Sequence, residues 1–87
     1  MTEAQKRVLE AMAEGAEMVL EIYNMEPWSH TSLKGKTISE TTFNSLLRDF
    51  WIEWCAGDRE GSVIIYWYRI TSAGRKAIEE ADDAEAK

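Results

Sequence analysis

The spacing of apolar residues predicts a helix near the start of the chain, over about residues 3–14. The residues of its apolar stripe are Val8, Leu9 and Met12. Thr2 and Gln5 match a capping box, in which each side chain covers the other residue's exposed backbone N–H. Gly15 then provides a natural stop for this helix.

A second apolar stripe predicts a short helix that begins at Ser39. Its apolar residues have the spacing of one buried helical face and are Phe43, Leu46, Leu47 and Phe50. At about 100° per residue, the opposite side of this helix is polar. That side consists of Thr41, Ser45 and Arg48, flanked by Thr42, Asn44 and Asp49. We therefore expect the helix to pack one side on a core and to present the other side outward.

Between these two helices, residues 17–23 fit two patterns. Their apolar and polar residues alternate well enough for a strand, whose inward-facing residues would be Met18, Leu20 and Ile22. They also fit a two-turn helix, whose apolar residues would be Met18, Ile22 and Met25. Pro27 excludes a helix that continues past it and Gly35 marks a turn, so residues 28–38 are expected to be extended or looped. We favour the strand.

Two further runs predict a β-hairpin, because β-branched and aromatic residues fill residues 50–55 and 63–70. The residues from Gly57 to Gly61 between them have turn composition. Alternation divides each strand into two faces. The face expected to join the core carries Ile52, Trp54, Ile64, Tyr66, Tyr68 and Ile70.

The opposite face of the hairpin carries a contiguous apolar patch that contains two tryptophans. Its members are Trp51, Val63, Ile65 and Trp67. Such a patch usually marks an interface, which predicts contact through Trp51, Ile65 and Trp67. The alternative is that residues 16–38 fold over the patch and make it part of the core.

The hairpin's second strand stops at Thr71, and another helix begins at once. Thr71 is well placed as N-cap, because its hydroxyl can accept a hydrogen bond from a free N–H of the first turn. The predicted elements follow in the order helix, hairpin and closing helix, and the second strand of the hairpin ends in Tyr68-Arg69-Ile70-Thr71. This order resembles the winged helix-turn-helix family. The resemblance covers roughly residues 39–80.

The resemblance implies an α+β fold that is a single winged-helix domain over residues 1–80. Its parts would be an N-terminal helix, a possible extra β excursion, a short recognition-type helix, a β-hairpin wing and a C-terminal helix. Residues 81–87 form an acidic tail that is expected to fray. If residues 17–23 are a strand, a β excursion replaces the usual second helix, which is a departure from the family.

The distribution of charge decides how far the net charge of -6 argues against a nucleic-acid partner. Residues 29–76 hold seven Lys and Arg against five Asp and Glu, whereas residues 1–28 and 77–87 each carry a net charge of -4. Binding to DNA needs basic groups near the phosphates. The middle of the chain therefore permits DNA binding without requiring it.

Winged-helix proteins place a helix in the major groove, so the resemblance implies a set of DNA-binding residues. On the Ser39 helix they are Thr41, Thr42, Asn44, Ser45 and Arg48. Lys34 and Lys36 would meet the DNA backbone, and Arg59 at the hairpin tip would reach a minor groove or a phosphate. The implied function is a sequence-specific transcriptional regulator that binds double-stranded DNA as a homodimer.

The alternative function is an acidic protein-interaction module that has lost DNA binding. Small winged-helix proteins of phage and prophage are similar to this chain, and one of that kind could act as an inhibitor that binds a host protein. Its contacts would come from the aromatic face of the hairpin and from the acidic ends of the chain.

Catalytic chemistry has no matching pattern. His30 is the only histidine and Cys55 the only cysteine, so we expect no His/Cys metal cluster and no cofactor. A Gly-rich phosphate loop is also missing, and an enzyme is not expected. No apolar run approaches the roughly 18 residues of a membrane helix, and the start lacks a signal peptide's apolar stretch. We therefore expect a cytoplasmic protein without a membrane partner.

Overall fold

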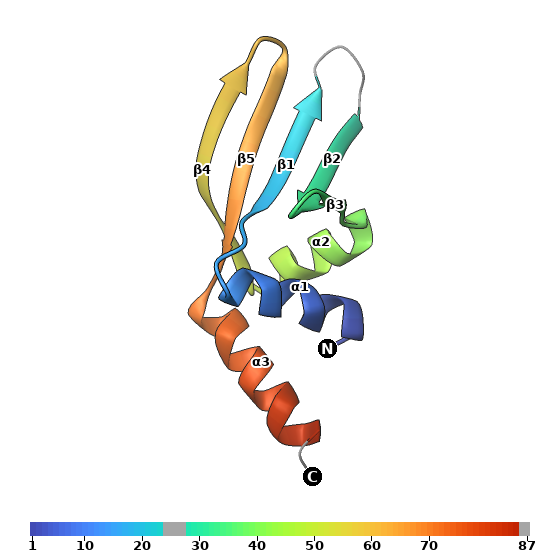
Figure 1. The fold of residues 1–87 in the computed structure, drawn as a ribbon, viewed down its shortest axis with the longest axis vertical. Coiled ribbons are helices and arrows are strands. Elements are labelled where there is room, and N and C mark those ends of the chain that lie inside the picture. The colour runs from blue at the N-terminus through green and yellow to red at the C-terminus, as the bar shows by residue number, and fades with distance from the viewer. Residues whose placement is uncertain (24–27, 86–87) are drawn as a thin grey trace.

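The computed structural model describes residues 1–23 and 28–85 (Figure 1). Its elements follow in the order α1 (Glu3–Ala13), β1 (Met18–Tyr23), β2 (Trp28–Leu33), β3 (Lys36–Thr37), α2 (Glu40–Arg48), β4 (Ile52–Glu60), β5 (Val63–Ile70) and α3 (Ser72–Glu85). The strands form one antiparallel sheet of order β3-β2-β1-β5-β4. The expected α+β class is confirmed. The finer winged-helix assignment stays a prediction, because β2 and β3 stand where the resemblance implies a second helix.

The segment that fitted two patterns forms strands. Residues 18–23 are β1, which pairs with β2 on one side and β5 on the other, so the strand prediction is confirmed. Met25, which the alternative helix would have needed, lies outside the described residues. The turn at Gly35 joins β2 to β3, as expected for an extended stretch. Because β1 and β2 lie in the plane of the sheet, they extend it and do not cover the hairpin's apolar patch.

The buried core lies at one end of the sheet. Its residues are Val8, Leu9, Met12, Met18, Leu33, Phe43, Leu46, Ile52 and Ile70. The four strand residues among them share one face by register, and we call this face the inner face and the opposite one the outer face. Figure 1 shows the helices gathered at this end while the strands run on past them. The molecule is accordingly elongated, at 50 × 22 × 20 Å.

Two apolar residues expected in the core are exposed. Phe50 is 77% exposed, because α2 ends at Arg48 and Phe50 is the left-handed residue of the Schellman motif that follows, with φ of 59°. In this motif the Phe50 N–H donates to the carbonyl of Leu47, and the N–H of Trp51 donates to that of Leu46. Trp54 does lie on the inner face, but beyond the reach of the helices, and it is 57% exposed.

The strand β4 contains a β-bulge. Its register with β5 shifts between Trp54 and Ala56, so Cys55 is an extra residue. The Cys55 Sγ donates to the backbone carbonyl of Trp67 at 3.3 Å, which fixes the bulge against β5.

Both predicted caps of the terminal helices are present. Thr2 and Gln5 form the expected capping box at α1. At α3, the hydroxyl of Thr71 accepts from the Gly74 N–H at 3.0 Å and donates to the Phe50 carbonyl at 2.6 Å. The Thr71 N–H also donates to the carbonyl of Trp51 at 2.9 Å. These bonds tie the entrance of β4 to the exit of β5.

The segment expected to fray is helical for most of its length. The helix α3 continues through Glu85, and residues 86–87 lie outside the described residues. Lys6 on α1 forms an ion pair with Asp82 at 2.9 Å, which links the two terminal helices. Within the described residues, no helix combines the length and the apolar character needed to cross a bilayer.

We expect Gly74→Ala to destabilise the fold by about 1–3 kcal/mol, although the same exchange in an open helix stabilises by about 1 kcal/mol. A Cβ at Gly74 would lie only 2.4 Å from the carbonyl oxygen of Trp51. Chemical denaturation measures the change in the free energy of unfolding. The control Ser72→Ala, at an exposed position of the same turn, should stay within about 0.5 kcal/mol of wild type. Equal stability of Gly74→Ala and wild type would contradict this close contact.

Candidate nucleic-acid interface

The exposed side of α2 is the first candidate surface. Phe43 and Leu46 bury the other side, and the rings of Phe43 and Tyr68 form a T-shaped pair with centroids 5.1 Å apart. This packing places α2 on the inner face of the sheet. It leaves exposed Thr41, Asn44 and Arg48, three of the predicted DNA-binding residues. They are spaced along one side of the helix, so they can reach one partner together.

Two other predicted residues of α2 are engaged inside the protein. The Ser45 hydroxyl accepts from the Gln5 side-chain amide and donates to the Thr42 carbonyl, both at 2.7 Å. Thr42 accepts through its hydroxyl from the N-cap Ser39 at 2.8 Å. Both side chains are half-buried. Ser45 therefore links α2 to α1, whereas the Thr42 hydroxyl bonds within the first turn of α2, and the sequence could not reveal that Gln5 bonds to Ser45.

The lysines of the β2–β3 turn lie beside α1. Lys34 and Lys36 line a hollow of about 360 Å³ together with Arg7, which is paired with Glu3 at 2.7 Å. The other lining residues are apolar: Val8, Ala11, Leu33 and Ile38. Arg7 was not singled out from the sequence, because no spacing signal connects it to residues so far along the chain. The structure thus groups these lysines with α1.

Arg59 lies near the tip of the β4–β5 hairpin, on the inner face. It pairs in register with Ile64, whose neighbours on that face run down to Ile70 in the core. Its Nε donates to the Gly61 carbonyl at 3.4 Å, and its side chain is exposed. Since α2 packs on the same face, Arg59 and α2 lie on one side of the sheet.

The charges of the longer strands, β1, β2, β4 and β5, are segregated by face. Register places on the outer face all the carboxylates of these strands: Glu21, Glu53, Asp58 and Glu60. The inner face of the same strands carries no carboxylate, and Arg59 is its charged residue. A negatively charged partner would therefore meet the carboxylates of the strands on the outer face, whereas on the inner side the groove beside α2 is lined by one carboxylate, Glu40.

The outer face also carries the predicted apolar patch, with one change. Ile65 and Trp67 are half-exposed, and their register partners on β1 are Glu21 and Val19, respectively. Trp51 is not part of this patch, because it precedes β4 and packs against the core beside α3. The Glu53 and Arg69 pair at 2.9 Å borders the patch.

A groove separates α2 from the uncovered part of the inner face. It measures about 340 Å³ and is lined by Leu20, Ile22, Ser29, His30, Thr31, Thr37, Ile38, Ser39, Glu40, Phe43 and Asn44. Tyr66 pairs with Leu20, and Trp54 pairs with Tyr68, so both aromatics continue this surface across the sheet. The sequence predicted that Trp54 and Tyr66 share the inner face, but not that the helices would leave this part of the face uncovered.

Two tyrosines have raised pKa values. Burial raises the pKa of Tyr68, with the nearby Tyr66 as a smaller cause. The hydroxyl of Tyr23 donates to the Glu21 carboxylate at 2.9 Å, and this bond is the main reason that the pKa of Tyr23 is raised. Because a raised tyrosine pKa favours the neutral form, the stability that it contributes is present below the unfolded value of 10.0 and is lost as pH rises through the folded pKa.

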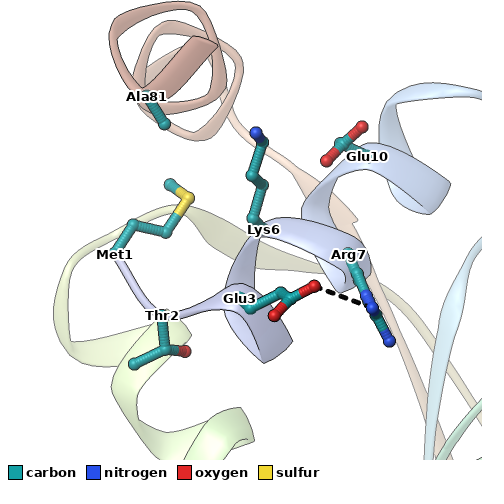
Figure 2. Close-up of a pocket in the computed structure, with 7 residues that line it drawn as sticks. All are labelled: Met1, Thr2, Glu3, Lys6, Arg7, Glu10 and Ala81. Carbon is teal, nitrogen blue, oxygen red and sulfur yellow. Dashed lines mark hydrogen bonds and ion pairs between the residues drawn. The ribbon is translucent and has the colours of Figure 1, made fainter. Parts of the chain in front are cut away.

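Another hollow, of about 330 Å³, lies between the start of α1 and α3 (Figure 2). Figure 2 shows Lys6 extended toward α3, while Glu3 and Arg7 pair with each other along α1. Lys6 in turn pairs with Asp82. The Lys6 and Asp82 pair joins the two helices, whereas Glu3 and Arg7 pair within α1, and none of the predicted site residues line this hollow.

Comparisons of this chain with models of protein families, with curated proteins and with solved structures give no match. Across residues 1–23 and 28–85, no three His, Cys, Asp or Glu side chains lie together in a way that could hold a metal ion. The proposed function is therefore based on the geometry of α2 and of the sheet.

We expect Ser45→Ala to destabilise the protein by about 1–3 kcal/mol, because it leaves the buried Gln5 amide without its partner. Thr41→Ala, on the exposed side of the same helix, is the matched control and should change stability by less than about 0.5 kcal/mol. Thermal and denaturant unfolding measure both variants. If the two variants were equally stable, Ser45 would not have the structural role assigned to it.

Proposed function

We propose that this protein is a transcriptional regulator that binds double-stranded DNA through α2 and the inner side of the β4–β5 hairpin. The observation that carries the proposal is the segregation of charge on the sheet. The carboxylates of the four longer strands stand on the outer face, while α2 and Arg59 stand on the inner side. A duplex approaching from that side avoids the sheet's negative charge.

The side chains available on α2 suit the reading of base edges. Asn44 can pair with adenine and Arg48 with guanine or a phosphate, and Thr41 can hydrogen-bond to either kind of base. Arg59 on the hairpin would contact the backbone or a groove next to the helix. Thr42 and Ser45 take no part in this contact, because they bond inside the protein.

The small number of basic groups sets the strength of the electrostatic contribution. With about three or four phosphates engaged, the logarithm of the binding constant should fall with the logarithm of salt concentration with a slope of about -3. This is a weak dependence for a DNA-binding protein. It follows from a chain whose net charge is -6.

We expect Arg48→Ala to weaken binding at the preferred site by about 1–3 kcal/mol. Selection from a duplex library, followed by titration at two salt concentrations, finds that site and measures the slope. Arg75→Ala removes the same charge from an exposed position on α3 and should leave the affinity within about twofold. Undetectable binding of the wild type to every duplex at about 50 mM salt would refute the proposal.

We also propose that the protein forms a homodimer through the outer face, around Ile65 and Trp67. Pairing two half-sites by a two-fold axis raises the affinity of small DNA-binding modules. The carboxylates around the patch would then approach those of the second copy. Salt screens this repulsion, so the dimer should tighten as salt rises, while DNA binding weakens.

We expect Trp67→Glu to convert the dimer to a monomer, because it adds a charge at the centre of the patch. The variant should remain folded, since Trp67 lies on the face opposite the core. Trp54→Glu, the same exchange on the inner face, is the control and should leave the dimer intact. Sedimentation at micromolar concentration and two salt concentrations measures the association. A monomeric wild type under both conditions would rule out this dimer, and an unfolded Trp67→Glu would assign Trp67 to the core.

A second candidate function is binding to a host protein, as for a phage-encoded inhibitor. The observation that favours it is the outer face itself, where an apolar patch is bordered by carboxylates. Such a surface complements a partner with an apolar centre and basic surroundings. This function is distinguished from the first if the wild type binds a host protein but no DNA, and if Trp67→Glu loses binding to that host protein.

A further inference from the structure

The uncovered part of the inner face carries two neighbouring aromatic side chains. Trp54 is 57% exposed, and Tyr66 is half-exposed on the adjacent strand. A Cβ placed at Gly57 would lie 3.2 Å from Cδ1 of Tyr66 and 3.4 Å from Cζ2 of Trp54. Both rings therefore lie beside the bare backbone of Gly57, on neighbouring strands of one face.

These two aromatic side chains lie between the two groups assigned to DNA contact. On one side, Trp54 is the register partner of Tyr68, whose ring packs on Phe43 of α2. On the other side, Tyr66 and Gly57 are followed toward the hairpin tip by Ile64 and Arg59 on the same face. A nucleic acid that reaches from α2 to Arg59 must pass over Trp54 and Tyr66.

The charge of the inner face suits a polyanion, whereas the charge of the outer face does not. The inner face of β1, β2, β4 and β5 has Arg59 and no carboxylate, in a chain whose net charge is -6. Aromatic rings in such a setting stack on bases, and they require bases that are not already stacked within a duplex. Stacking of this kind tolerates any base, because every base has a flat face.

We propose that Trp54 and Tyr66 stack on unpaired bases, so that the nucleic acid bound by this protein contains a single-stranded segment beside the duplex read by α2. The proposal rests on the proposed function in that it takes the partner to be nucleic acid. It adds a class of target, namely a junction of double and single strand, that duplex reading by α2 does not require.

The experiment compares three fluorescently labelled probes: a blunt duplex, a thymidine single strand, and the same duplex with a thymidine overhang. Wild type should bind the overhang probe at least about fivefold more tightly than the blunt duplex, since one stacked base contributes about 1–3 kcal/mol. Trp54→Ala should abolish this gain, so that the variant binds the overhang probe and the blunt duplex with equal affinity. Trp54→Phe should retain most of the gain, because a phenyl ring still stacks.

The control is Phe50→Asn, which removes another highly exposed aromatic side chain and suits the left-handed backbone at that position. It should keep the full gain from the overhang. Circular dichroism and denaturation first establish that each variant is folded, as expected for a residue as exposed as Trp54.

The outcomes separate this inference from the proposed function. Duplex binding that depends on Arg48, with no gain from the overhang, would overturn the stacking proposal and leave the regulator intact. A gain that survives Trp54→Ala would also overturn it. Binding of the single strand through Trp54 without duplex binding would support stacking and refute duplex reading by α2. If none of the three probes binds, both proposals fail.

Discussion

The fold depends on the crossing of two backbone segments where β4 begins and β5 ends. The carbonyls of Phe50 and Trp51 both accept hydrogen bonds from Thr71, and Gly74 lies directly against Trp51. Such a close approach of two main chains leaves no space for a side chain. It fixes where the hairpin joins the helices and in which direction α3 departs. The contact between α3 and α1, with its Lys6 and Asp82 pair, follows from that direction.

The same crossing concentrates the core at one end of the sheet. The helices bury the strand residues closest to the crossing, such as Ile52 and Ile70, and leave the far part of each strand without cover. A sheet face that is apolar and uncovered forgoes the stabilisation that burial brings, about 25 cal/mol for each Å². A partner that covers this face would recover that stabilisation.

Local signals in the sequence predicted local structure well. Thr2 and Thr71 each cap a helix as expected, since a cap involves only the following turn. Alternation also assigned the strand residues to faces, and Tyr66 and Trp54 do share the inner face. The α+β class follows from these elements, so it could be predicted from the sequence.

Exposure could not be predicted in the same way, because it depends on how far a distant element reaches. Periodicity placed Trp54 on the correct face but could not tell that the helices end before it. Ser45 belongs to the polar side of its helix, yet Gln5 from α1 occupies it. Phe50 continued the apolar stripe in sequence, but the helix had already ended. Of the predicted DNA-binding residues on α2, Thr41, Asn44 and Arg48 are exposed while Ser45 bonds to α1, and their contact with DNA stays a prediction.

The bulge at Cys55 has a consequence for the whole hairpin. Since alternate residues of a strand point to opposite faces, one extra residue reverses the side of every residue after it. Without the bulge, Asp58 and Glu60 would point to the inner face and Arg59 to the outer one. The bulge therefore shifts the alternation of the strand by one position. This shift decides the face on which each charged residue of the hairpin tip lies. The inner face carries Arg59 and the outer face carries Asp58 and Glu60 because of one position in the chain that has no charge itself.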